Sequence, residues 1–213
     1  ITLSPEGGAH QSISTPLIGL GQPGLAYFEP AFADELAEIM RWGFKHMQAD
    51  GGGAVYLRLS TRPADQPDRI MDEALVANVV AGGYWLERPK NLNAGAIVYA
   101  GALASETILA GAEIKGAGIL AITSPDRLYK DWCINGEKSQ IAKLLKDIDR
   151  NAPIVTVLDG HPATLSWIGA VAGHRVRPLG IGDFGQCDFI DCVLNIPPAA
   201  IGGTKGSADD TGK

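Results

Sequence analysis

The sequence predicts an α/β protein whose mostly parallel sheet is covered by helices on both faces. Runs that are apolar at nearly every position, such as AGAIVYAGAL and GAGILAITS, alternate with segments whose apolar residues recur with a helical period. Strands that are buried on both faces give such continuous apolar runs. The 27 glycines and 13 prolines indicate many turns and short connections rather than long helices. We expect right-handed crossovers between the parallel strands.

The first 60 residues predict loops, then one helix and one strand. Residues 1–26 are rich in glycine and proline and predict loops around at most one short strand. Residues 27–48 carry apolar side chains at helical spacing, namely Phe32, Leu36, Ile39, Met40, Phe44 and Met47. Pro30 is expected in the first helical turn, with acidic residues near the amino end and basic ones near the carboxyl end. After the DGGG turn, residues 54–60 predict a strand.

A charged stretch with two prolines separates this unit from a second α/β run. Residues 61–69 (TRPADQPDR) are typical of a linker, and within 70–93 the pattern indicates only a short strand around 82–89. Strands are predicted at 94–103, 116–124, 152–160 and 174–183, and helices at 105–114, 137–150 and 162–173. Ser105 is the expected cap of the first of these helices, and Ser124 is expected to open a turn. Residues 202–213 lack large apolar side chains and predict a disordered tail.

Composition argues against several classes of partner. The net charge is −6 at pH 7 and the 18 basic residues are scattered, so we expect neither a nucleic-acid interface nor a polybasic membrane patch. The longest apolar runs are too short to cross a bilayer. Cys133, Cys187 and Cys192 show no disulfide framework, which favours ordinary thiols in a reducing cytoplasm over a metal site. Because the sequence begins at Ile1 rather than at methionine, we expect a piece of a longer polypeptide.

Two motifs match the sequence pattern or position of a ligand-binding site, but the surrounding sequence does not favour such a site. GLGQPG at 19–24 matches G-x-G-x-x-G, but no strand precedes it and Pro23 interrupts it before the next helix begins. LDGHPATLSW places Asp159 and His161 at the end of a predicted strand, where α/β folds bind ligands, yet a helix cap and a contact histidine are the favoured interpretation. His46 and His174 are expected to be solvated. A G-x-S-x-G elbow and a P-loop are both absent from the sequence.

His10, in SPEGGAHQS, is the main candidate for chemistry. It follows two glycines and an alanine, small residues that let a substrate or cofactor approach the backbone closely. Gln11 and Ser12 add hydrogen-bonding groups beside it. The residues alone leave two alternatives equally open, a functional histidine and a solvated loop histidine.

The EGGAHQS loop resembles the D-G-x-x-H-Q loop of the transketolase superfamily, the thiamine diphosphate enzymes. FEPAFADELAEIMRWGF and VYLRLSTR are similar to the end of its pyrimidine-binding domain. VAGGYWLERP, AIVYAGALASE, TSPDRLYKDW and TVLDGHPATLSWIGAVAGHRVRPLGIGDFGQ follow in order and resemble the transketolase carboxyl-terminal domain. The resemblance runs to about Gln186, beyond which CDFIDCVLNIPP looks shortened and altered. It is nearest to single-chain, homodimeric pyruvate dehydrogenase, the decarboxylating component of 2-oxo-acid dehydrogenase complexes.

The resemblance implies a division of the chain and a set of site residues. Residues 1–66 would end the pyrimidine-binding domain, 67–92 would be a linker, 93–201 a transketolase carboxyl-terminal-like domain, and 202–213 the tail. His10 would be catalytic, contacting the substrate carbonyl or the reaction intermediate. Glu6 and Arg62 would bind substrate, at or near positions where transketolases carry a sugar-binding aspartate and a phosphate-binding arginine. The longer side chain of Glu6 mildly favours a 2-oxo acid over a sugar.

The implied cofactors are thiamine diphosphate and Mg²⁺, with the cofactor acting as the electron sink. The G-D-G…N segment that binds metal and diphosphate in the family, and the glutamate that activates the aminopyrimidine, are not found in this sequence. We therefore expect the chain alone to be inactive and to bind the cofactor weakly. His161 falls in a domain that serves dimer contacts in relatives rather than chemistry.

The leading interpretation is thus part of a pyruvate dehydrogenase component. It would act in the cytoplasm as a homodimer and would pass its acyl unit to a lipoyl-bearing acyltransferase. One alternative is a transketolase that moves two-carbon units between sugar phosphates. The other is a non-catalytic dimerisation or assembly module that keeps only the fold.

Overall fold

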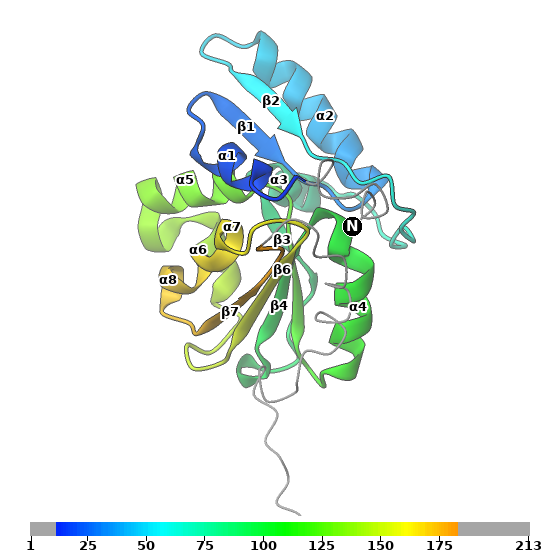
Figure 1. Ribbon diagram of the computed structural model, residues 1–213, viewed down its shortest axis with the longest axis vertical. Coiled ribbons are helices and arrows are strands. Elements are labelled where there is room, and N and C mark those ends of the chain that lie inside the picture. The colour runs from blue at the N-terminus through cyan, green and yellow to red at the C-terminus, as the bar shows by residue number, and fades with distance from the viewer. Residues whose placement is uncertain (1–11, 183–213) are drawn as a thin grey trace, which may run out of the picture.

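The computed structural model describes residues 12–182, which form two parallel-stranded units stacked one above the other (Figure 1). The smaller unit begins with helix α1 (Thr15–Gly21) and contains a two-stranded parallel sheet of β1 (Leu25–Phe28) and β2 (Ala54–Leu57). In the register of this sheet, Leu25 lies opposite Ala54 and Phe28 opposite Leu57. The long helix α2 (Ala33–Gln48) connects the two strands and packs beside them.

The larger unit is a five-stranded sheet in the order β3-β5-β4-β6-β7. Its strands are β3 (Gly83–Glu87), β4 (Ala96–Ala100), β5 (Gly118–Ile122), β6 (Ile154–Leu158) and β7 (Val176–Leu179). β4, β5, β6 and β7 pair in parallel, and the edge strand β3 pairs with β5 in the antiparallel sense. The four strands predicted between residues 94 and 183 are confirmed as β4, β5, β6 and β7. β4, β5 and β6 are buried at every position, which explains their continuous apolar sequences.

Helices cover both faces of this sheet, as the sequence predicts. On one face, Ile97 and Val155 of the sheet pack with Ala110 of α4 (Ala104–Glu113) and Val79 of α3 (Glu73–Ala81). On the other face lie α5 (Pro125–Asn135), α6 (Gln140–Leu145), α7 (Ala163–Ser166) and α8 (Ile168–Ala172). Three short 3₁₀ turns complete the described elements: η3 (Leu92–Ala94), η4 (Gly101–Leu103) and η5 (Gly136–Lys138). The class is therefore mixed α/β with a mostly parallel, helix-covered sheet.

Helix α2 differs from its prediction in where it begins and in what it buries. It begins at Ala33, and Pro30 lies in the extended segment before it rather than in its first turn. The Glu35 carboxylate accepts hydrogen bonds from the backbone N–H groups of Ala31 (2.7 Å) and Phe32 (3.1 Å), so the helix starts where these donors find an acceptor. Of the predicted apolar stripe, Ile39 is fully buried, whereas Met40, Phe44 and Met47 are 39–53% exposed.

Several local predictions are wrong in detail. Residues 15–21 form the helix α1, whose proline lies in the first turn, where it is tolerated. Gly19 lies within α1, so GLGQPG does not have the strand–turn–helix arrangement of a dinucleotide site, which agrees with the prediction made for this motif. Ser105 lies inside α4, where the N-cap position belongs to Leu103. The helix predicted at 137–150 is divided into η5 and the short α6, because Ser139 caps α6 by accepting from the Ala142 N–H.

The stretch for which a linker was expected, 67–92, contains α3 and β3. Asp72 caps α3 by accepting from the Leu75 N–H (2.8 Å), and the helix ends at Gly82, whose φ is +118°. β3 then joins the larger sheet as an edge strand. The domain boundaries themselves stay a prediction.

The remaining expectations concern histidines, membranes and the chain ends. His174 is buried, contrary to the expectation of a solvated ring, and His46 is half-buried and stacked on Trp42. Between residues 12 and 182, none of the helices has the length and apolarity needed to cross a membrane. His10, Glu6, Cys187, Cys192 and the predicted tail lie outside the described residues.

Candidate functional site

The carboxyl ends of the two sheets face each other. Glu29 directly follows β1, and its backbone N–H donates to the carbonyl of Thr123, which directly follows β5 (2.8 Å). Arg58 directly follows β2, and its Nη2 donates to the carbonyl of Asp159, which directly follows β6 (2.6 Å). In doubly wound folds this edge of a parallel sheet is the usual ligand site. Here the smaller unit covers it.

A buried ionic cluster lies at the centre of this junction. The Glu29 side chain is 2% exposed, pairs with Arg58 (Nη1 to Oε1, 2.5 Å), and accepts a hydrogen bond from the Tyr27 hydroxyl. Burial raises the pKa of Glu29, while Arg58 and the hydrogen bond from Tyr27 oppose the rise. Burial, reinforced by the neighbouring Glu29 carboxylate, holds the pKa of Tyr27 well above its ordinary value. This arrangement suits a fixed structural contact better than proton exchange with a substrate.

Gly101 shows how closely the junction is packed. It follows β4, has a φ of +56°, and a Cβ there would collide with the side chain of Glu29. His161, the other candidate at this edge, accepts at its ring Nδ1 from the backbone N–H of Ala163 (3.2 Å), and the backbone N–H of His161 donates to the carbonyl of Ile13 (2.9 Å). These contacts agree with the interpretation of His161 as a structural contact residue at a helix start.

A second polar cluster attaches the stretch around residue 69 to both units. Arg69 forms paired hydrogen bonds with the carboxylate of Asp34 on α2 (2.7 and 2.8 Å) and donates to the hydroxyl of Tyr84 on β3 (2.6 Å). The Tyr84 hydroxyl in turn donates to Glu35. Burial raises the pKa of Tyr84, and the Glu35 carboxylate raises it further. This network joins α2 to the larger sheet.

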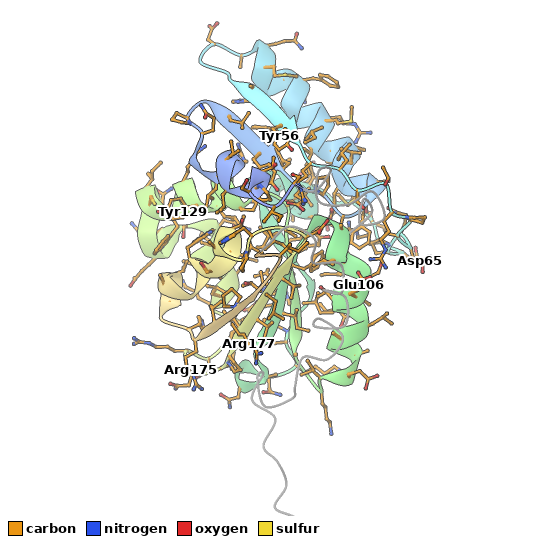
Figure 2. The ribbon with its side chains drawn as sticks, in the orientation of Figure 1. Tyr56, Asp65, Glu106, Tyr129, Arg175 and Arg177 are labelled. Carbon is orange, nitrogen blue, oxygen red and sulfur yellow. The ribbon has the colours of Figure 1, made fainter. Side chains whose placement is uncertain are left out.

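Arg62, the predicted substrate-binding residue that the structure describes, pairs with Glu106 of α4. The Arg62 side chain is 32% exposed, whereas the Glu106 side chain is 4% exposed. Arg62 Nη1 faces Glu106 Oε1, whereas Glu106 Oε2 is buried and has no hydrogen-bond partner among residues 12–182. Figure 2 shows Glu106 near the amino end of α4, on the side of the molecule where Asp65 of the 61–69 segment projects.

The predicted site residues are therefore only partly placed. His10 and Glu6 lie outside the described residues, so their distance from Arg62 stays a prediction. Among residues 12–182, no group of three or more His, Cys, Asp or Glu side chains could hold a metal ion. The sequence reasoning missed Glu29 and Arg58, because Glu29 lies in the stretch predicted as a helix and Arg58 lies inside the predicted strand 54–60.

Comparisons with known proteins give a fold but no close relative. No protein-family profile and no curated protein sequence matches the chain. Among solved structures, a transketolase mutant from Pichia stipitis superposes with a TM-score of 0.63 at 18% identity, and a transketolase from Leishmania mexicana with 0.64 at 14%. Each match covers 94% of this chain and 28% of the transketolase.

A third solved structure is a split-gene transketolase, described as an inactive β4 tetramer. It has a TM-score of 0.60 at 17% identity and is matched over 91% of this chain and 64% of its own. The present chain thus spans less than a third of the single-chain transketolases that it matches and about two thirds of the split-gene subunit. The agreement over nearly the whole chain, in the order of elements described above, shows that the protein has a transketolase-like fold.

Proposed function

We propose that this chain is the carboxyl-terminal part of a thiamine diphosphate-dependent enzyme, and specifically of a pyruvate dehydrogenase component. The observation that carries the proposal is the transketolase-like fold together with the ordered family segments, EGGAHQS included. The enzyme would decarboxylate a 2-oxo acid and pass the acyl unit to a lipoyl group on an acyltransferase partner. A homodimer in the cytoplasm is part of the same proposal.

The contacts between the two sheets support a model in which the two units of the chain have different roles. At the carboxyl edge of the five-stranded sheet, Glu29 and Arg58 contact the backbone of Thr123 and Asp159, so the smaller unit occupies part of the place where this fold usually binds a ligand. The chemistry would then come from the smaller unit and the loop before it. In this proposal His10 orients the substrate carbonyl and moves protons there, and Glu6 contacts the remainder of the substrate. Arg62 would bind substrate in the transketolase alternative, where it would contact the phosphate of a sugar.

Thiamine diphosphate, when bound, would supply the electron sink for decarboxylation. Residues 12–182 bring together no metal-ligand cluster, so we assign neither Mg²⁺ nor the diphosphate to them. Both would be held by protein beyond this chain, either an upstream segment or a partner subunit. The split-gene transketolase is a precedent for a separate subunit of this fold, and that tetramer is described as inactive.

The Arg62–Glu106 pair favours a small oxo acid over a sugar phosphate. The Arg62 charge is already balanced by a nearly buried carboxylate, and a phosphate would have to compete with Glu106 for it. Transketolase activity is the second candidate, because the solved structures of this fold include transketolases with fructose 6-phosphate and sedoheptulose 7-phosphate.

The deciding experiment is an assay of the enzyme that contains this chain. We expect pyruvate-dependent acetylation of a lipoyl domain and no transfer of two-carbon units between xylulose 5-phosphate and ribose 5-phosphate. Sugar transfer without acetyl transfer would identify a transketolase, and neither activity would identify an assembly module. In isothermal titration, the 213-residue chain alone should bind thiamine diphosphate weakly. Binding with a micromolar Kd would contradict the assignment of the cofactor to protein beyond this chain.

Variants of the pair separate the two activities. Arg62→Gln should leave the KM for pyruvate within about threefold, because the pair is internal to the protein. If the enzyme is a transketolase that binds phosphate through Arg62, the same variant should raise the KM for the sugar phosphate by tenfold or more, roughly the value of one charge-assisted contact. Glu106→Gln is the matched variant, and it should strengthen sugar-phosphate binding in the transketolase case only.

A further inference from the structure

A cavity away from the junction lies between η5, α6 and α8. Its volume is about 460 Å³, which falls within the size range of small-molecule pockets. Apolar side chains line part of it, among them Leu145, Ile148 and Val171. Leu145 and Ile148 belong to the core on this face of the sheet, so this part of the wall is held by packing.

The lining of the cavity carries more positive than negative charge. Lys138, Lys146 and Arg150 line it, against one acidic residue, Glu137. None of the three cations takes part in an ion pair within residues 12–182. The chain as a whole has a net charge of −6. The three cations at this cavity, which form no ion pair with residues 12–182, should therefore create a local positive potential that attracts anions.

Two features give the cavity fixed polar geometry. The Arg150 guanidinium lies against the backbone of Gly173, where a Cβ would come within 2.9 Å of its Nε. Gly173 has a φ of +76° and ends α8, so the chain turns there and leaves room for the guanidinium. His174 is 7% exposed and lines the cavity, and its Nδ1 faces the Ala152 carbonyl at 3.3 Å. If Nδ1–H donates to that carbonyl, Nε2 is the ring nitrogen left for another partner.

We propose that this cavity binds a small phosphate-bearing molecule with an apolar body, the chemistry of a nucleoside monophosphate. The phosphate would contact Arg150 and Lys146 at the mouth, where an arginine fork binds phosphate oxygens in pairs. The base would lie against Leu145 and Val171, and His174 would offer it a ring nitrogen. The cavity lies at the amino-terminal ends of β6 and β7, whereas this fold usually binds ligands at the carboxyl ends of its strands. The proposal does not rest on the function proposed above.

The test is isothermal titration of AMP into the 213-residue chain, with adenosine, ribose 5-phosphate and inorganic phosphate as separate arms. We expect saturable binding of AMP and at least about tenfold weaker binding of each of the other three, because each lacks either the charge or the apolar body. Adenosine binding as tightly as AMP would overturn the role of the cations. Ribose 5-phosphate binding as tightly as AMP would overturn the role of the apolar wall.

Matched variants locate the site. Arg150→Gln and Lys146→Gln should each weaken AMP binding by about tenfold. Arg175→Gln and Lys143→Gln remove exposed cations that do not line the cavity, and should leave binding unchanged; Arg175 is labelled in Figure 2. All four positions are exposed, so circular dichroism should show four folded variants. Unchanged binding in the first pair, equal losses in both pairs, or no saturable binding of AMP would each refute the proposal.

Discussion

Removal of Arg58 is the sharpest test of the junction between the two sheets. In Arg58→Met the long apolar part of the side chain is kept and the charge is lost. Glu29 then stays 2% exposed without its cationic partner. Removing one partner of a buried ion pair lowers the free energy of unfolding by about 3–5 kcal/mol. Because Arg58 is itself only 16% exposed, solvent cannot replace it easily, and we expect a loss of unfolding free energy in that range.

The loss should depend on pH in a defined direction. Burial raises the pKa of Glu29 above its unfolded value, and Arg58 is the largest opposing influence. A raised carboxyl pKa means that the folded state binds its proton more tightly, so stability falls as pH rises through the interval between the unfolded and folded pKa values. Without Arg58 this interval widens. The destabilisation in Arg58→Met should therefore be smaller at about pH 5 than at about pH 8.

Urea denaturation followed by circular dichroism at both pH values measures the effect. Arg41→Met is the control, because Arg41 pairs with Glu38 on the exposed side of α2 with a side chain 66% exposed, and should cost no more than about 1 kcal/mol. The double variant Glu29→Gln/Arg58→Met should recover about 1–2 kcal/mol of the loss at the higher pH. A cost in Arg58→Met equal to that of the control, or one that grows as pH falls, would refute the buried-pair argument.

Three further predictions concern this junction and the buried tyrosines. Gly101→Ala should destabilise the protein by about 2–4 kcal/mol in urea denaturation, because its Cβ meets Glu29 and its φ is +56°; a loss below 1 kcal/mol would mean that the contact is loose. Ser124→Ala removes the donor to the Tyr27 carbonyl (2.6 Å) and should cost about 1–2 kcal/mol, whereas Ser124→Thr should retain part of this. Burial raises the pKa values of Tyr27, Tyr84 and Tyr99, so their protonated forms support the fold, and stability should be lost as pH rises above their unfolded values. Absorbance at 295 nm should then show these rings ionising only with unfolding, and ionisation in a folded chain would contradict the prediction.

The larger sheet was predictable because its strands carry their own signal. AIVYA, GILAI and IVTVL are apolar at nearly every position, as expected of strands that are covered on both faces, and every position of these strands is buried. Helix α1 was not predictable in this way. Thr15–Gly21 is short and contains glycine and proline, and contacts with α5 and β1 rather than intrinsic propensity hold it as a helix.

Helix α2 shows a limit of a different kind. The spacing of Met40, Phe44 and Met47 correctly predicts a helix but not whether a neighbour covers that face. In the described structure the sheet beside α2 has two strands, and these side chains are half exposed. Exposure depends on what packs against a helix, and the sequence of the helix itself does not contain that information.

The candidate site was less predictable than the fold. Arg62 became a candidate through the family resemblance. Its ion pair with Glu106 joins residues 44 positions apart, and no local sequence pattern predicts such a pair. The same holds for Glu29 and Arg58, which are 29 positions apart. A charged residue after a strand is common in loops, and only the topology shows that two of them meet beneath a second sheet.

The opposed sheet ends constrain how this protein can change over evolutionary time. A doubly wound domain ordinarily acquires new specificities by altering the loops at its carboxyl edge, one loop at a time. Here those loops contact the smaller unit, so we expect a side chain at Gly101 to require a compensating change at Glu29, and a substitution of Asp159 to remove a carboxylate that lies 3.8 Å from Arg58. We therefore expect new binding specificities to arise at the opposite, amino-terminal rim of the strands.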